Sequence, residues 1–266
     1  MTISIIKIGG NVIDNPENLD GFLNLFSKFP GKKILIHGGG VMASRFGESL
    51  GVMPQMKDGR RITDLDTLQV VTMVYAGLIN KELVAKLQLR NQNAIGLSGA
   101  DGNLIRSKKR TVKDIDYGYV GDVEEINIDL IDLLVSKQMI PVVCAITHDK
   151  KGQLLNTNAD TIASEMATSL SKKHTVNLYF CFQKPGVLID ENNDASLIPF
   201  INEEIYEELK KEKVIHSGMI PKLDNAFKAL NEGVNQVWLG LPENLLWAEK
   251  GKKSGTCIEK HRYDLY

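Results

Sequence analysis

Short apolar runs rich in β-branched residues alternate along this chain with segments whose apolar residues recur at helical spacing. Parallel strands need a crossover connection, usually a helix, so this alternation predicts an α/β fold. We expect a three-layer sandwich with a central, mainly parallel sheet and helices on both faces. The expected strands are 3–8, 33–37, 140–145, 175–182 and 235–239. The expected helices are 19–29, 41–50, 65–90, 131–137, 161–170, 203–211 and 219–233.

Two stretches depart from this alternation. Residues 104–125 are basic, turn-rich and alternating, which predicts hairpins over one edge of the sheet. Residues 171–174 are polar and precede a strand, which makes them a candidate boundary between two lobes, 1–172 and 173–266. A length of 266 residues with 43% hydrophobic content suits one large domain or two modest ones.

Charge and cysteine content argue against several classes of protein. The net charge is −1, from 32 Lys and Arg against 33 Asp and Glu, so the chain has no overall attraction for nucleic acid or anionic lipid. Cys144, Cys181 and Cys257 lie far apart, which disfavours a disulfide framework and a metal site. The chain starts directly with an apolar strand and contains no stretch of membrane-spanning length. We expect a cytoplasmic protein without a nucleic-acid or membrane partner.

Four short segments point to the handling of an anion. They are Lys7 with Gly9 and Gly10, then 37–40, 156–160 and 218–222. They offer lysine charge, glycine backbone N–H groups and a carboxylate that could hold two lysines, which are the groups that phosphoryl transfer requires. The hypothesis to test is therefore a phosphotransferase.

Each segment also has a purely structural explanation. Lys7 could extend from an edge strand, and Asn158 or Asp160 could simply cap a helix. Three glycines after a buried strand favour ligand contact over a simple turn. Lys222 would stand in the first turn of a helix, where the helix dipole disfavours a cation unless an anion is its partner. Arg61, just before another expected helix, could bind a carboxylate or lie in solvent.

Taken together, these segments resemble the amino acid kinase family. Within it they are most similar to the branch that phosphorylates the side-chain carboxylate of N-acetyl-L-glutamate, because Gly9-Gly10-Asn11 differs from the first loop of the other branches. The resemblance runs nearly end to end. The segments that carry it are 6–10, 36–40, 59–63, 96–102, 155–160 and 218–222.

The resemblance implies a role for each matching residue. For phosphoryl transfer these are Lys7, Asp160, Lys222, Gly10 and Gly39. For the amino acid substrate they are Gly39, Gly40, Arg61, Asn156 and Asn158. For ATP they are Gln183, Gly186, Leu188, Ile215, His216, Gly218 and Met219. Mg²⁺ would be held mainly by the nucleotide phosphates, with no metal site in the protein.

The resemblance also implies an arginine-biosynthetic kinase whose N-terminal lobe binds the substrate and forms a homodimer, and whose C-terminal lobe binds ATP. A carboxylate substrate has a reference pKa of about 4.3 and is already ionised, so no general base is expected. Residues 181–186 depart from the family pattern on the nucleotide side. The acyl group, acetyl or succinyl, stays open, as do another carboxylate substrate and a non-catalytic ligand sensor on this fold.

Overall fold

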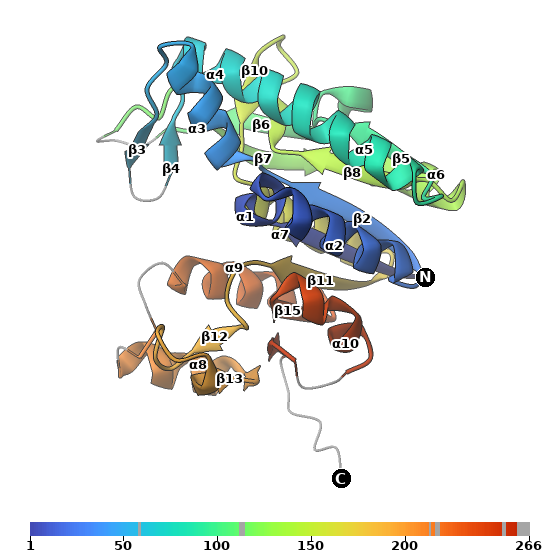
Figure 1. The fold of residues 1–266 in the computed structure, drawn as a ribbon, viewed down its shortest axis with the longest axis vertical. Coiled ribbons are helices and arrows are strands. Elements are labelled where there is room, and N and C mark those ends of the chain that lie inside the picture. The colour runs from blue at the N-terminus through green and yellow to red at the C-terminus, as the bar shows by residue number, and fades with distance from the viewer. Residues whose placement is uncertain (58–59, 112–114, 213, 216–218, 252–253, 260–266) are drawn as a thin grey trace.

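A single large sheet forms the centre of the computed structural model, which describes residues 1–57, 60–111, 115–212, 214–215, 219–251 and 254–259 (Figure 1). Every pair of neighbouring strands in it is parallel except β15 and β16. The strand order, from one edge to the other, is β14 (Phe200–Ile201), β16 (Thr256–Ile258), β15 (Gln236–Gly240), β11 (Thr175–Cys181), β1 (Thr2–Ile8), β2 (Lys32–His37), β8 (Ile140–Cys144) and β5 (Ala94–Leu97).

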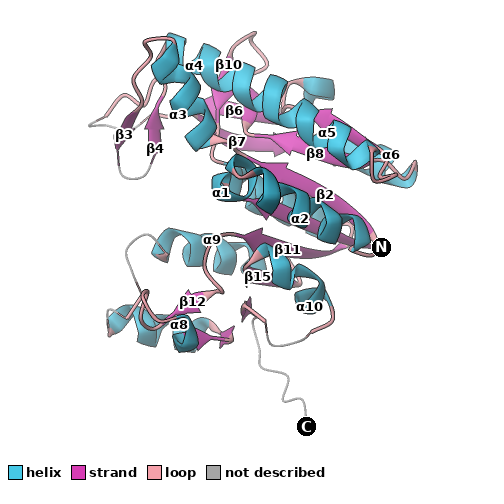
Figure 2. Cartoon of the chain, viewed as in Figure 1, coloured by secondary structure: helices cyan, strands magenta, loops and turns pink. Residues whose placement is uncertain are grey.

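Helices cover both faces of this sheet, as Figure 2 shows. The α-helices are α1 (Gly10–Asp14), α2 (Pro16–Lys28), α3 (Gly40–Ser49), α4 (Leu65–Thr72), α5 (Asn80–Gln88), α6 (Ile128–Ser136), α7 (Ala159–Ser171), α8 (Glu203–Lys211), α9 (Ile220–Asn231) and α10 (Leu245–Glu249). The predicted α/β fold with a mainly parallel sheet is thereby confirmed. None of the helices in the described part of the chain combines the length and the apolar content that crossing a membrane requires.

The predicted strands and helices lie where they were expected, and the structure adds elements that the sequence pattern did not show. The helix expected over 65–90 is α4, a π-helical segment η1 (Met73–Ile79) and α5. The short strands β5, β14 and β16, the helices α1 and α10, and the strands outside the main sheet other than β6 and β7 were not predicted. Residues 104–125 contain the antiparallel pair β6 (Ile105–Lys109) and β7 (Gly121–Ile126).

The antiparallel pair β6 and β7 confirms the expected hairpin but is not hydrogen-bonded to the main sheet. It belongs to a second sheet, completed by β9 (Ile146–His148) and β10 (Leu154–Asn156), because β9 supplies the edge that β6 pairs with. Two further pairs are β3 (Gln55–Lys57) with β4 (Arg60–Ile62), and β12 (Val187–Leu188) with β13 (Leu197–Ile198). The remaining short elements are the 3₁₀ turns η2 (Asp101–Asn103), η3 (Asp194–Ser196) and η4 (Pro242–Asn244).

The central strands are apolar on both faces because helices cover both sides. One buried lysine, Lys33 on β2, is an exception. Its Nζ donates to the carbonyl oxygens of Phe26 at 2.7 Å and Phe29 at 2.8 Å, at the C-terminus of α2. Burial lowers the pKa of Lys33 to about 8. This lysine satisfies carbonyl groups that the helix end leaves without an internal partner.

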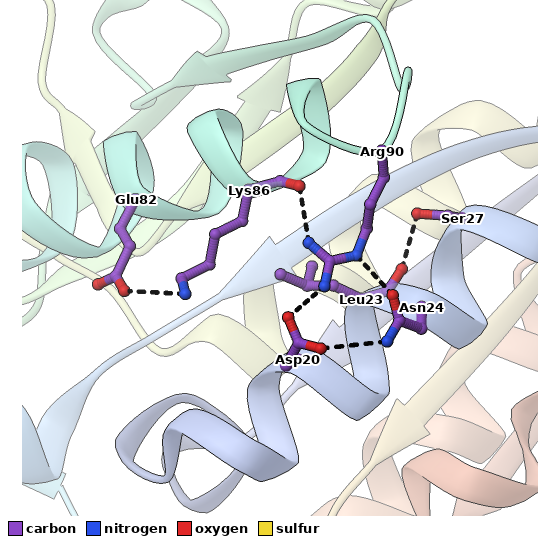
Figure 3. A network of polar contacts seen from close by, with 7 residues as sticks. All are labelled: Asp20, Leu23, Asn24, Ser27, Glu82, Lys86 and Arg90. Carbon is purple, nitrogen blue, oxygen red and sulfur yellow. Dashed lines mark hydrogen bonds and ion pairs between the residues drawn. The ribbon is translucent and has the colours of Figure 1, made fainter.

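A polar network joins α2 to the end of the helix containing α5 (Figure 3). Arg90 donates to the Lys86 carbonyl oxygen at 2.9 Å, to Asn24 Oδ1 at 2.8 Å, and to Asp20. Asn24 in turn donates to Asp20 Oδ2 at 3.1 Å. One planar guanidinium thus fixes two helices that lie far apart in sequence.

Candidate active site

The carboxyl ends of β1 and β2 lie at one edge of the sheet, and three helices begin there. Lys7 is the penultimate residue of β1, and α1 follows at Gly10. His37 ends β2, and α3 follows at Gly40. Asp160 lies in the first turn of α7. Ligands of parallel α/β sheets bind at this edge, where helix N-termini favour anions.

Asp160 bridges two lysines. Lys7 Nζ lies 2.6 Å from Asp160 Oδ1, and Lys222 Nζ lies 2.6 Å from Asp160 Oδ2. Burial would raise the pKa of this carboxyl, but the charges of the two lysines outweigh it and hold the pKa well below its usual range. β1 lies between β2 and β11, so the edge-strand explanation of Lys7 is wrong. The arrangement orients two cations side by side.

Gly39 requires glycine for two reasons. Its φ of 147° lies in a region that side chains rarely adopt. A Cβ atom there would lie 2.2 Å from Ile79 Cδ1, on η1. Gly39 is also the N-cap of α3 and offers no side-chain cap, so the first N–H groups of that helix remain available to an anion.

One cavity of about 240 Å³ joins most of the predicted catalytic and substrate residues. It is lined by Lys7, Gly10, Gly39, Gly40, Arg61, Asn156, Asn158 and Asp160 among others. Lys222 reaches this group through Asp160. Segments that lie far apart in the sequence therefore meet at one site, as expected.

The proposed substrate residues are held by local hydrogen bonds. Arg61 is half-buried, and its Nη2 donates to the Gly40 carbonyl oxygen at 2.9 Å and to Ser44 Oγ at 2.8 Å, so it is not a freely solvated arginine. Asn156 Nδ2 donates to Thr63 Oγ1 at 3.0 Å. Asn158 is the N-cap of α7, as its local sequence suggested. These bonds fix the orientation of each polar group before a ligand binds.

Several residues that line this cavity were not assigned from the sequence, and those with functional side chains or large contact surfaces are Met56, Tyr75 and Arg110. Tyr75 lies on η1 and, like Ile79, packs against Gly39. Burial raises the pKa of the Tyr75 hydroxyl. Arg110 follows β6, pairs with Asp122 and lies 5.8 Å from the Tyr117 ring centroid. For Arg110, the only indication in the sequence was the basic character of residues 104–125.

A second cavity of about 310 Å³ lies on the other side of the first glycine turn, because Gly9 lines it while Gly10 lines the first cavity. Its lining includes the predicted nucleotide residues Gln183, Gly186, Leu188, Ile215 and Met219. His216 and Gly218 lie outside the described residues. Sequence reasoning did not assign Asn11, Val12, Phe182, Lys184, Val187 and Glu191, which also line it.

The site's chemistry suits an anion rather than a resident metal. Both oxygens of Asp160 are taken by lysines. In the described part of the chain, no group of three or more His, Cys, Asp or Glu side chains could hold a metal ion.

Comparison with known proteins decides the family, since the model of the amino acid kinase family matches residues 2–240. The chain belongs to the amino acid kinase family. It is 53% identical to the acetylglutamate kinase of Cytophaga hutchinsonii, over 96% of this chain and 97% of that protein. It is 49% identical to the acetylglutamate kinase of Phocaeicola vulgatus, over 97% and 98% respectively.

Solved structures agree with this membership. The structure of smu.665 from Streptococcus mutans UA159 has a TM-score of 0.80 and 29% identity, covering 97% of this amino acid kinase and 99% of that chain. An N-acetylglutamate synthase from Neisseria gonorrhoeae has a TM-score of 0.82 at 19% identity, covering 98% of this chain and 60% of that one. At that identity the likeness concerns the fold alone.

Proposed function

We propose that this amino acid kinase transfers the γ-phosphoryl group of ATP to the side-chain carboxylate of N-acetyl-L-glutamate, or of a close N-acyl-L-glutamate, in arginine biosynthesis. The observation that carries the proposal is Asp160 holding Lys7 and Lys222 at 2.6 Å each, beside a cavity that suits an amino acid. Full-length relatives that are acetylglutamate kinases support the same activity.

The reaction needs positioning and charge, not proton removal. The attacking carboxylate is already ionised at neutral pH. Its attack on the γ-phosphorus forms one P–O bond and breaks the bond to ADP, so negative charge gathers on the phosphoryl oxygens. Lys7 and Lys222 would offset that charge, and the backbone N–H groups of Gly10 and Gly39 would donate to it. Asp160 keeps both ammonium groups in place throughout.

The other half of the substrate would be held by polar groups of the same cavity. Arg61 and Asn156 would bind the α-carboxylate, and Gly40 and Asn158 would lie near the acyl end. Arg110, although paired with Asp122, also lines the cavity and adds a second guanidinium group to it. Because a guanidinium group can bind a carboxylate, N-succinyl-L-glutamate, which carries a third carboxylate, is the second candidate substrate.

The proposal divides the chain into residues 1–172 for the acyl amino acid and dimer formation, and 173–266 for ATP. The second cavity, which is lined mainly from the second part, would hold the nucleotide. Magnesium, held chiefly by the phosphates, would neutralise part of their charge. We further propose a cytoplasmic homodimer.

The test is formation of an acyl phosphate from Mg-ATP, trapped with hydroxylamine. N-acetyl-L-glutamate, N-succinyl-L-glutamate, free glutamate and aspartate would be offered in parallel. Turnover of an N-acyl-glutamate, abolished by Lys7→Met, is the expected result. ATP binding without turnover of any of the four would contradict the kinase proposal and favour a ligand sensor.

A further inference from the structure

His37 directly precedes the glycine segment 38–40 of the site and is fully buried. Its Nδ1 lies 2.9 Å from the carbonyl oxygen of Gly38, and its Nε2 lies 3.1 Å from Asn80 Nδ2. Neither His37 nor Asn80 lines the two cavities. His37 therefore acts on the site through its contact with Gly38, and Asn80 acts through His37.

The hydrogen bonds around Asn80 fix which of its atoms is the donor. Its Nδ2 also donates to the Val142 carbonyl oxygen at 2.9 Å, and its Oδ1 accepts from Lys81 Nζ at 3.1 Å. Because Nδ2 must donate, His37 Nε2 must be the acceptor. The imidazole proton then resides on Nδ1, where it is donated to Gly38.

Burial lowers the pKa of His37 to about 4, so the imidazole stays neutral near pH 7. Other titratable or charged groups near this segment are Lys81 on α5, Cys144 on β8, Tyr75 on η1 and Lys7 on β1. Burial raises the pKa of Cys144 to about 12 and also raises that of Tyr75, so neither competes for the proton between pH 6 and 9.

The helix that carries Asn80 also supports the next residue of the loop. Ile79 and Tyr75, on η1, occupy the space against which Gly39 is packed. Asn80 follows η1 directly and donates a hydrogen bond to Val142 on β8. The residues that pack against Gly39 and the donor to His37 therefore belong to one continuous helical segment. π-helical turns of this kind are often found at functional sites.

We propose that Asn80 is a positioning residue that selects the Nδ1-protonated tautomer of His37, and that this tautomer orients the Gly38–Gly39 peptide toward the transferring phosphoryl group. The inference rests on the proposed function for its kinetic consequence. The tautomer itself can be measured without any activity. His37 is thereby assigned no role as a general base.

The decisive variant is Asn80→Asp, which keeps the shape and exchanges a donor for a carboxylate; it also removes the hydrogen bond to Val142, but that loss does not depend on the protonation of His37. When the imidazole is protonated, it can donate to both the new carboxylate and Gly38. When it is neutral, Nε2 must carry the proton, and Nδ1 can no longer donate to Gly38. We expect kcat of this variant to stay within about 3-fold of the original at pH 6 and to fall about 10-fold or more by pH 9, with KM values little changed.

The original protein should show no such decline. Imidazole ¹⁵N NMR should find its His37 in the neutral Nδ1-protonated form across pH 6–9, and a protonated ring at pH 6 in the variant. Asn177→Asp, at a half-buried position on β11 where Asn177 accepts from Asn235 at 2.9 Å, is the matched control and should leave the pH profile unchanged. A variant profile parallel to the original, or an original ring protonated on Nε2, would overturn the proposal.

A second pair of variants keeps the test valid if Asn80→Asp does not fold. His37→Asn retains a donor near the position of Nδ1, whereas His37→Gln places its amide near Nε2. The proposal expects kcat of His37→Gln to be at least about 5-fold lower than that of His37→Asn at equal thermal stability. Equal kcat values would refute it. If the original protein shows no turnover, the proposed function fails, while the NMR measurement still tests the tautomer.

Discussion

Lys222 Nζ lies 2.6 Å from Asp160 Oδ2, although the two residues are 62 positions apart in the sequence. Both lie in the first turns of helices, Lys222 in α9 and Asp160 in α7. A lysine at a helix N-terminus is unfavourable by about 0.3–1 kcal/mol unless an anion compensates it. Here Asp160 supplies that anion, and the lysine remains directed toward the site.

Replacement of Lys222 by methionine should lower kcat by about 10²–10³-fold and change the KM values little, because its charge acts on the transition state. Steady-state kinetics in the hydroxylamine assay would measure both parameters. Lys228→Met is the matched control, since Lys228 lies on the same helix and pairs with the half-buried Glu165 at 2.9 Å. Equal losses in the two variants would argue against a role for Lys222 in phosphoryl transfer.

The lowered pKa of Asp160 predicts a pH-dependent contribution to stability. A carboxyl whose folded pKa is depressed stabilises the fold above its unfolded pKa, about 3.9, and the contribution disappears as the pH falls toward the folded value. Asp160→Asn should therefore melt at a lower temperature than the original protein at pH 7, and the difference should narrow below about pH 4. Thermal melts from pH 3.5 to 8 would measure it. A gap that stays constant over this range would contradict the assignment.

Gly39→Ala should impair both folding and turnover. The substitution combines an unfavourable φ, which costs about 1–3 kcal/mol, with a contact of 2.2 Å to Ile79 Cδ1. Gly31→Ala is the control, because Gly31 has a φ of 75° but no atom within 4 Å of the added Cβ. Ile79→Ala should partly rescue Gly39→Ala in a double-mutant cycle of thermal stability. Additive effects would show that crowding by Ile79 is not the cause.

Arg61→Lys should raise KM for the N-acyl-glutamate by about 10-fold or more, because lysine cannot reproduce a planar, two-pronged contact with a carboxylate. KM for ATP should not change, since Arg61 does not line the second cavity. Initial-rate kinetics with each substrate varied in turn would separate the two. Arg106→Lys, which alters a surface ion pair with Glu124 and Glu125, should change neither constant.

Arg110→Gln tests the acyl group. If the second arginine of the cavity binds a carboxylate of the acyl chain, kcat/KM should fall about 10-fold or more for N-succinyl-L-glutamate and far less for N-acetyl-L-glutamate. Competition between the two substrates, analysed by mass spectrometry of the trapped products, gives the ratio directly. An unchanged ratio would remove Arg110 from the determinants of acyl specificity.

Much of the fold follows from local sequence patterns. The central strands can be predicted because strands covered on both faces are apolar throughout. The helices can be predicted because each carries an apolar stripe. The two-residue strand β14 and the three-residue strand β16 are too short to show any period, and only pairing within the sheet defines them. The sequence does not distinguish the π-helical segment 73–79 from an α-helix, because its residues continue an ordinary helical pattern.

In the candidate site, too, some features follow from the sequence and others only from the tertiary structure. The sequence by itself determined which groups were available, because a lysine at a strand end, three successive glycines and a lysine in a first helical turn each conflict with purely structural preferences. The tertiary structure alone decided that Lys7 and Lys222 share Asp160, that Ile79 crowds Gly39, and that Arg110 faces the cavity. The physical reason is that local patterns report on hydrogen bonding and burial within one element, whereas ion pairs and cavity walls depend on distances between elements that only packing sets.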